Sequence, residues 1–325
     1  MSVALETAKK ISMIVPIYNE TAVIQEFYRR ASSALAALEG LDYEIVFVDD
    51  GSRDDSYAQL QALASDDERI RVLKFSRNFG HQIAITAGLD HAVGDCIVVI
   101  DADLQDPPEV VSKMVDKWRE GYDVVYGKRS DREGETFMKL LTAKLFYRVL
   151  DKMVRIKIPT DVGDFRLMSR RAADQLRDLR EKDRYVRGLV SWIGFKQTGV
   201  EYHRDKRYAG ETKYPYSKMI KFALDGITSF STVPLKMATW FGYAASALAF
   251  LYLASVFVQK YLLKNTVEGW ATIMVGILFM GGVQLICLGI IGEYIGRIFN
   301  EIKPRPIYIV EDCLNPVDEG ADRTP

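Results

Sequence analysis

The sequence lacks three features that define common classes of protein. Of its 325 residues only three are cysteine, and the spacing of Cys96, Cys287 and Cys313 matches no metal-binding or redox motif. The N-terminus, MSVALETAKKISMIVPIY, has no signal-peptide architecture. The formal net charge is only −1, which as an average indicates no polyanionic partner such as a nucleic acid. A disulfide-stabilised secreted protein and a nucleic-acid-binding protein are therefore not expected.

Two long hydrophobic runs are present, although the mean hydropathy of the whole chain is only −0.05. Residues 237–259 and 269–292 contain no charged side chain. Each run is longer than the ~20 residues with which a helix crosses ~30 Å of hydrocarbon. One such run would also suit a core helix of a soluble protein, but two in tandem favour a membrane. We therefore predict an integral membrane protein with two transmembrane helices within 237–295.

The flanks of these runs predict an orientation. Basic residues lie outside the pair, at Lys213, Lys218, Lys221, Lys236, Arg297, Lys303 and Arg305. Only two lysines lie between the runs, and basic flanks stay on the cytoplasmic side, so we expect both termini to be cytoplasmic. Gly282, Gly289 and Gly296 recur at a constant spacing in the second run. Such glycines permit close helix packing, either between the two helices or in a homo-oligomer.

The N-terminal part of the chain alternates between strand and helix patterns. Short apolar runs typical of strands cover 12–18, 43–48, 70–75, 96–100 and 123–126. Helical patterns between them cover 20–38, 54–64, 81–91 and 107–118. This alternation predicts an α/β fold with a largely parallel sheet, in which ligands bind beyond the carboxyl ends of the strands. Acidic or polar turns follow three strands, at 16–20, 48–52 and 100–106, so we expect the ligand there.

Two segments nearer the hydrophobic runs are amphipathic and basic. In 137–153 and 218–230, apolar residues recur at helical spacing beside lysines and arginines. A helix packed on its own domain is the usual explanation. The alternative is an interfacial helix in the headgroup region of the cytoplasmic leaflet, which proximity to the spans favours for the second segment.

The acidic turns contain carboxylates that are able to bind ligands. Asp101 and Asp103 follow an apolar strand, so both can approach one hard cation, Mg²⁺ or Mn²⁺, whose coordination phosphate oxygens often complete. Gln105 could add a carbonyl oxygen. Asp49 and Asp50 end another strand, where a carboxylate can accept hydrogen bonds from a nucleobase or ribose, or form only an Asx turn.

Six motifs occur in an order and at a spacing that resemble glycosyltransferase family 2, with its GT-A (Rossmann-like) fold. They are PIYNE at 16–20, VDDGS at 48–52, DADLQ at 101–105, GKR at 127–129, DVGDFR at 161–166 and RYAGETK at 207–213. More narrowly, the chain is similar to polyprenyl-phosphate glycosyltransferases, the family of bactoprenol glucosyltransferases and dolichol-phosphate mannose synthase, over about residues 10–300. The Q-x-x-R-W motif of processive family 2 synthases is absent, which argues against polysaccharide extrusion.

The resemblance implies a role for each matched residue. The nucleotide would be bound by Pro16, Tyr18, Glu20, Asp49, Asp50, Arg77 and Ala102. The divalent cation, Mg²⁺ or Mn²⁺, would be bound by Asp101, Asp103 and Gln105. The phosphate of the acceptor would be bound by Arg129, Arg207 and Lys213, for which a solvated basic surface is the alternative. Asp103 and Asp164 would be catalytic, Asp164 either as a base or as a group that positions the sugar.

The implied reaction transfers a sugar from a nucleotide sugar to a polyprenyl phosphate, undecaprenyl or dolichyl, with inversion at the anomeric carbon. UDP-glucose is the favoured donor, with GDP-mannose and UDP-N-acetylhexosamine as alternatives. Two other classes remain open: a processive or protein-directed glycosyltransferase, and a non-enzymatic membrane channel or flippase partner. The implied reaction has two phosphorylated substrates. The net charge of −1 would then result from cancellation between acidic ligand-binding turns and basic patches that face the lipid.

These predictions divide the chain into four parts. Residues 1–213 would form a cytoplasmic GT-A domain with an amphipathic helix at about 135–153, and 214–236 a juxtamembrane amphipathic helix. Residues 237–295 would form the two transmembrane helices, and 296–325 a cytoplasmic tail. The favoured location is the inner (plasma) membrane of a bacterium.

Overall fold

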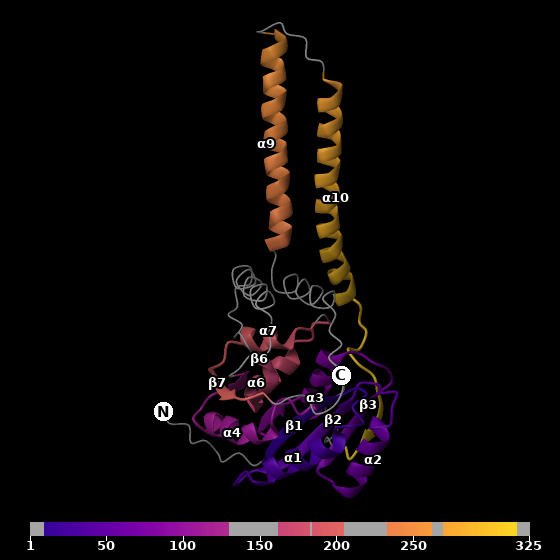
Figure 1. Ribbon diagram of the computed structural model, residues 1–325, viewed down its shortest axis with the longest axis vertical. Coiled ribbons are helices and arrows are strands. Elements are labelled where there is room, and N and C mark those ends of the chain that lie inside the picture. The colour runs from indigo at the N-terminus through magenta and orange to yellow at the C-terminus, as the bar shows by residue number, and fades with distance from the viewer. Residues whose placement is uncertain (1–9, 130–161, 183, 205–232, 262–268, 317–325) are drawn as a thin grey trace. The chain divides into compact units, whose positions relative to one another are not determined.

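The computed structural model describes residues 10–129, 162–182, 184–204, 233–261 and 269–316 (Figure 1). These residues belong to two compact units, one of which contains the N-terminal part together with 305–325, and the other 219–304. The amphipathic helices predicted at about 135–153 and at 214–236 lie outside the described residues, apart from the last residues of the second.

A mixed eight-stranded sheet forms the centre of the first unit. In spatial order its strands are β7 (Gln197–Tyr202), β5 (Val124–Arg129), β6 (Val162–Ser169), β4 (Cys96–Val99), β1 (Lys10–Ile17), β2 (Asp42–Asp49), β3 (Ile70–Phe75) and β8 (Val310–Leu314). The block β4-β1-β2-β3 is parallel, whereas β6 is antiparallel to β4 and β5, and β8 is antiparallel to β3. The predicted α/β class is confirmed, but the sequence analysis did not predict β6, β7 or β8.

Helices cover both faces of this sheet. They are α1 (Ile24–Ala36), α2 (Ser56–Asp66), α3 (His81–His91), a 3-10 turn at Pro108–Val110 followed by α4 (Val111–Arg119), α6 (Arg170–Asp178) and α7 (Val186–Trp192). The side chains of β2 alternate between the two faces, so that Phe47 packs in one apolar cluster and Val46 and Val48 in another. Gly88 allows α3 to pack closely against β1, because a Cβ at this position would lie 2.2 Å from the side chain of Ile14.

The C-terminal segment is part of the sheet. Residues 296–325 were predicted to be a tail, but within them β8 pairs with β3 along its full length, from Val72↔Leu314 to Phe75↔Val310. The prediction missed this strand because its sequence, VEDCL, is short and half polar. A strand of this kind has little local signal and forms because β3 offers an unpaired edge.

The described part of the second unit contains two long helices in contact, α9 (Val233–Tyr261) and α10 (Trp270–Glu301). The Cys287 thiol lies 3.5 Å from the carbonyl oxygen of Ala238. Within the residues that the structure fully describes, one stretch, Val275–Glu301 of α10, is long and apolar enough to cross a membrane, with a mean hydropathy of 2.2. The prediction of two spans is thus confirmed in part: α10 contains this candidate span, and α9 forms a helix over the first run.

The glycine stripe of α10 makes no close contact with the described side chains of α9. A Cβ built on Gly282, Gly289 or Gly296 would meet no described side chain within 4 Å. The sequence left two alternatives for these glycines, packing between the two helices or in a homo-oligomer. The described residues do not show the first of these.

Candidate active site

A cavity of about 620 Å³ lies at the carboxyl ends of the parallel strands. The predicted residues that line it are Pro16, Tyr18, Glu20, Asp50, Asp101, Ala102, Asp103 and Asp164. It is also lined by Ile17, Asn78, Gly80, His81, Ala84 and Arg187, which were not predicted. The three acidic or polar turns therefore meet at one edge of the sheet, as the parallel topology requires.

The turns after β1 and β2 are tied to each other by hydrogen bonds. Asn19, in the left-handed conformation with φ 55°, donates its backbone N–H to Ser52 Oγ at 3.0 Å. Its side-chain oxygen accepts from the Arg53 amide at 2.8 Å. The helix predicted to begin at Glu20 begins only at Ile24, because the intervening residues form this turn. The turn leaves the Tyr18 side chain 44% exposed at the cavity.

Asp50 organises the loop that follows β3. Its carboxylate accepts hydrogen bonds from the amides of Phe79, at 2.6 Å, and Gly80, at 2.9 Å. Burial raises the pKa of Asp50, and these backbone hydrogen bonds oppose that shift. Asp49, by contrast, is fully buried, accepts from the Ser52 amide at 3.2 Å and does not line the cavity. Its carboxylate closes the local turn through the amide three residues ahead and does not face the cavity.

A glycine allows the β2 turn and the β3 loop to touch. Gly51 has φ +69°, and a Cβ there would lie 2.5 Å from the carbonyl carbon of Arg77. The Arg77 side chain itself is exposed, with its guanidinium 4.1 Å from the centre of the Phe79 ring, and it does not line the cavity.

Asp101 and Asp103 stand at the cavity wall after β4. Asp103 accepts a hydrogen bond from the Gln105 amide at 3.1 Å, in a turn where Leu104 has φ 59°. The Gln105 side chain points elsewhere: its oxygen accepts from Arg204 Nη2 at 2.7 Å, and the residue does not line the cavity.

The two carboxylates fit a divalent cation that a phosphorylated ligand helps to bind. Within the described ranges, no group of three or more His, Cys, Asp and Glu side chains is placed to hold a metal ion by itself. Mg²⁺, however, is commonly held by one or two carboxylates together with substrate phosphates and water. Burial raises the pKa of Asp101 to about 6, and the charges of Asp164, Asp106 and Asp103 add to this, while His81 opposes it. A cation beside Asp101 would relieve this unfavourable charge.

Asp164 is buried and held by cations from two helices. Arg187 of α7 donates to both of its oxygens, at 2.9 and 3.1 Å, and His81 Nε2 of α3 lies 3.3 Å away. Although burial alone would raise it, the Arg187 charge and the His81 hydrogen bond keep the pKa of Asp164 well below its usual range. Burial lowers the pKa of His81, but the hydrogen bond to Asp164 and the charges of Asp101 and Asp164 prevail and raise it to about 9. Asp164 is therefore a fixed, ionised and weakly basic carboxylate.

The predicted phosphate-binding cations are only partly described. Arg129, at the end of β5, lies 3.9 Å from Asp106 Oδ2, and its buried Nε has no hydrogen-bond partner among the described residues. Arg204 flanks the same carboxylate at 3.9 Å. Arg207 and Lys213 lie outside the described residues.

Two parts of this chain match known protein families. Residues 12–177 match the model of Glycosyl transferase family 2. The chain belongs to this family. Its α/β domain is accordingly a GT-A domain, and residues 233–298 match a second family, the GtrB C-terminal hairpin.

Relatives of this glycosyltransferase cover almost its whole length. An uncharacterised glycosyltransferase, YkcC, of Bacillus subtilis is 53% identical over 92% of this chain and 93% of its own. A prophage bactoprenol glucosyl transferase homologue of Escherichia coli is 44% identical over 93% of this chain and 98% of its own. Among solved structures, glucosyl-3-phosphoglycerate synthase of Mycobacterium tuberculosis is more distant, at 23% identity, 68% and 79% coverage and a TM-score of 0.45.

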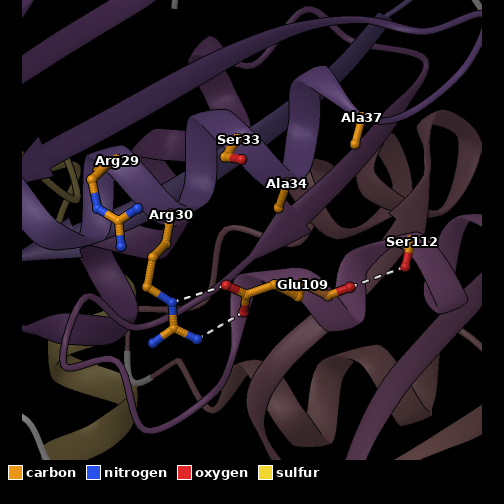
Figure 2. Close-up of a pocket in the computed structure, with 7 residues that line it drawn as sticks. All are labelled: Arg29, Arg30, Ser33, Ala34, Ala37, Glu109 and Ser112. Atoms are coloured by element: carbon orange, nitrogen blue, oxygen red, sulfur yellow. Dashed lines mark hydrogen bonds and ion pairs between the residues drawn. The ribbon is translucent and has the colours of Figure 1, made fainter.

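A second hollow on the glycosyltransferase domain, of about 410 Å³, contains none of the predicted residues. Figure 2 shows its lining residues, Arg29, Arg30, Ser33, Ala34, Ala37, Glu109 and Ser112. Arg30 and Glu109 point at each other and form a two-pronged ion pair at 2.9 and 2.8 Å. Arg29 is paired with Glu26 at 2.6 Å. The Arg30–Glu109 pair joins α1 to the turn before α4, whereas the Arg29–Glu26 pair lies within α1.

Proposed function

We propose that this glycosyltransferase transfers glucose from UDP-glucose to a polyprenyl phosphate, with inversion at the anomeric carbon. One observation carries the proposal: a single cavity brings together the nucleotide turns, the Asp101–Asp103 pair and Asp164. The names of full-length relatives, which include bactoprenol glucosyl transferases of Shigella phages, support the sugar and the lipid. Membership in a glycosyltransferase family also favours an enzyme over a channel or flippase subunit.

On the donor side, the nucleoside diphosphate would lie across the turns after β1, β2 and β4. The residues proposed to hold it are Pro16, Tyr18, Glu20, Asp50 and Ala102. Asp101 and Asp103 would hold Mg²⁺ or Mn²⁺, which when bound neutralises the charge that develops on the leaving diphosphate. Gln105 could join them only after its side chain leaves Arg204, so we assign the cation to the two aspartates first.

Asp164 positions the sugar in this proposal. An oxygen of the acceptor phosphate forms the new bond to the anomeric carbon, while the bond from that carbon to the diphosphate breaks and the nucleoside diphosphate leaves. A phosphate monoester is already largely ionised near neutral pH, so no strong base has to remove a proton. The low pKa of Asp164 and its two-pronged contact with Arg187 favour orientation and charge stabilisation over proton abstraction.

On the acceptor side, Arg129, Arg207 and Lys213 are proposed to bind the lipid phosphate. Arg129 is the described member of this group, and its guanidinium lies beside the Asp106 carboxylate and close to Gly163, the residue before Asp164. Cations are needed here because the acceptor is an anion that must approach an anionic donor.

We propose further that α9 and α10 both cross the membrane and return the chain to the same side. If α10 crossed alone, β8 would lie across the bilayer from β3, with which it forms one sheet. A second crossing before α10 is therefore required, and α9 is the helix available for it. The basic flanks then favour the cytoplasm for the catalytic domain and for both termini.

Transfer of radiolabel tests the function. The full-length protein in detergent, given UDP-[¹⁴C]glucose, Mn²⁺ and undecaprenyl phosphate, should produce a labelled product that partitions into organic solvent. GDP-mannose and UDP-N-acetylglucosamine in parallel reactions identify the sugar, and excess chelator should stop transfer. Label that appeared only in polymer or protein would favour the processive or protein-directed alternative instead.

A further inference from the structure

The C-terminal segment contacts the loop that forms one wall of the donor cavity. Residues 76–80 connect β3 to α3, and Asn78 and Gly80 of this loop line the cavity together with His81, the first residue of α3. The ladder between β3 and β8 continues one step past the end of β3, where the Ser76 amide donates to the carbonyl oxygen of Ile309 at 3.1 Å. The first residue of the loop is therefore held by the chain that follows α10.

Tyr308 extends this contact through aromatic packing. Its ring stacks on Phe75 at 5.3 Å between centroids, with 19° between the planes. Phe75 in turn packs edge-on against Phe79 at 5.5 Å. The Phe79 amide is one of the donors to Asp50, so the row of rings runs from the C-terminal segment to a carboxylate of the donor cavity.

Tyr308 also holds the far end of the helix that follows the loop. Its hydroxyl donates to Asp90 Oδ2 at 2.9 Å, and Asp90 lies in the last turn of α3, the helix that begins at His81. Arg180, which follows the end of α6, donates to the same carboxylate oxygen at 2.8 Å. One side chain thus touches the strand before the loop and the helix after it.

We propose that Tyr308 is a positioning residue of the donor site: together with β8 it holds residues 76–81 in the conformation that binds the nucleoside diphosphate. The inference rests on the proposed function in one respect, namely that the ligand of the cavity is a nucleotide. It assigns the segment after α10 to the donor site, although that segment contributes no residue to the cavity lining.

The matched variants are Tyr308→Phe, Tyr308→Ala and the control Tyr57→Phe. Tyr308→Phe keeps the stack on Phe75 and removes the bond to Asp90, whereas Tyr308→Ala removes both. Tyr57 of α2 donates its hydroxyl to Asp312 of β8, so its Phe variant also removes one tyrosine–aspartate bond to this strand, but away from the loop. All are compared as full-length protein in detergent, with the midpoint of thermal unfolding recorded for each.

Titration calorimetry with UDP and Mn²⁺ gives the main result. We expect Kd to rise about threefold for Tyr308→Phe and about tenfold or more for Tyr308→Ala, the effects of one hydrogen bond and of that bond with an aromatic pair. Tyr57→Phe should stay within about twofold of the unmodified protein. In turnover, KM for the donor should rise by a larger factor than kcat falls, because Arg187, the largest charge on Asp164, is untouched.

Hydrogen exchange separates this inference from the proposed function. The amides of Phe79 and Gly80 should exchange faster in both Tyr308 variants than in the unmodified protein. In Tyr57→Phe their exchange rates should be unchanged. If the unmodified protein bound no nucleotide, the proposed function would fail while the exchange data still decided the role of Tyr308. If Tyr308→Phe matched the unmodified protein in Kd, KM and exchange, the inference would be overturned, whether or not Tyr308→Ala folds.

Discussion

Asp101 and Asp164 are two aspartates of one cavity with opposite electrostatics. His81 Nε2 lies between them, 3.5 Å from Asp101 and 3.3 Å from Asp164. The pKa of Asp101 is raised by burial to about 6, while that of Asp164 is held well below its usual range because the charges and hydrogen bonds of Arg187 and His81 together outweigh burial. One side of the cavity has a cation built into the protein, and the other has carboxylates suited to a cation that arrives with the ligand.

This difference teaches how the two sides divide the work. A carboxylate already paired with Arg187 cannot gain much from a metal ion, so in the proposed reaction Asp164 faces the sugar. Asp101, whose pKa is raised, would gain most from a cation bound with Asp103 and the donor phosphates. The predictions below weaken one side at a time, from the largest expected effect to the smallest.

The metal side should show the largest loss. Asp103→Ala is expected to reduce transfer by at least about 10³-fold, because removal of a Lewis acid at the leaving group costs several kcal/mol of transition-state stabilisation. Transfer of radiolabel with varied Mn²⁺ measures it. Asp116→Ala, at an exposed position of α4, is the control for loss of a carboxylate. Full activity of Asp103→Ala in excess chelator would remove the metal from the proposal.

The side with the built-in cation should lose less and change its pH dependence. Arg187→Gln is expected to lower kcat about 10²-fold and to raise the pKa of Asp164, because the largest charge that stabilises its ionised form is gone. As pH falls, Asp164 would then be protonated earlier, so the acid limb of the kcat profile should move to higher pH.

Coupling between the two residues sharpens this prediction. Arg187→Lys should keep more activity than Arg187→Gln, because it keeps the charge but not the two-pronged geometry. Asp164→Asn combined with Arg187→Gln should be no worse than the poorer single variant, because both disrupt one unit. Full turnover of Asp164→Asn with saturating donor and metal would contradict its assigned role.

A glycine at the turn after β2 tests the donor side through its backbone. Gly51→Ala adds a Cβ 2.5 Å from the Arg77 backbone at φ +69°, so the β3 loop must move and nucleotide affinity should fall about tenfold. Gly40→Ala is the matched control, since Gly40 has φ +72° but nothing within 4 Å of the added Cβ. Calorimetry with UDP compares them, and equal affinities would show that the contact does not shape the site.

The smallest effect concerns the histidine shared by both sides. Because the pKa of His81 is raised from 6.5 to about 9 in the folded protein, its stabilisation is fully present below pH 6.5 and is lost as pH rises through about 9. His81 is 43% exposed, so solvent screening reduces the effect to roughly 1 kcal/mol. Thermal unfolding of the unmodified protein and His81→Gln should therefore diverge at low pH and converge at high pH. A difference that did not depend on pH would contradict the pairing.

Much of the donor side could be predicted from the sequence because it depends on local patterns and one topological rule. Apolar runs followed by PIYNE, VDDGS and DADLQ place polar turns after strands, and parallel pairing brings the carboxyl ends of those strands to one edge. Asp49, Gln105 and Arg77 were included with their motifs, but their side chains turn away from the cavity. A motif predicts which turn is used, while the orientation of each side chain depends on its neighbours.

Only the tertiary structure decided the partners of Asp164 and the place of the C-terminal strand. Arg187 and His81 reach Asp164 from two helices that are distant from it in sequence, and β8 meets β3 after the chain has passed through α9 and α10. Neither pairing leaves a periodic or local signal in the sequence. The first depends on where the folded sheet buries the charge of Asp164, and the second on where it leaves the edge of β3 unpaired. By itself, the sequence determined the family, the α/β alternation, the apolar runs and the turns that carry the donor carboxylates, since these follow from residue spacing along a single chain.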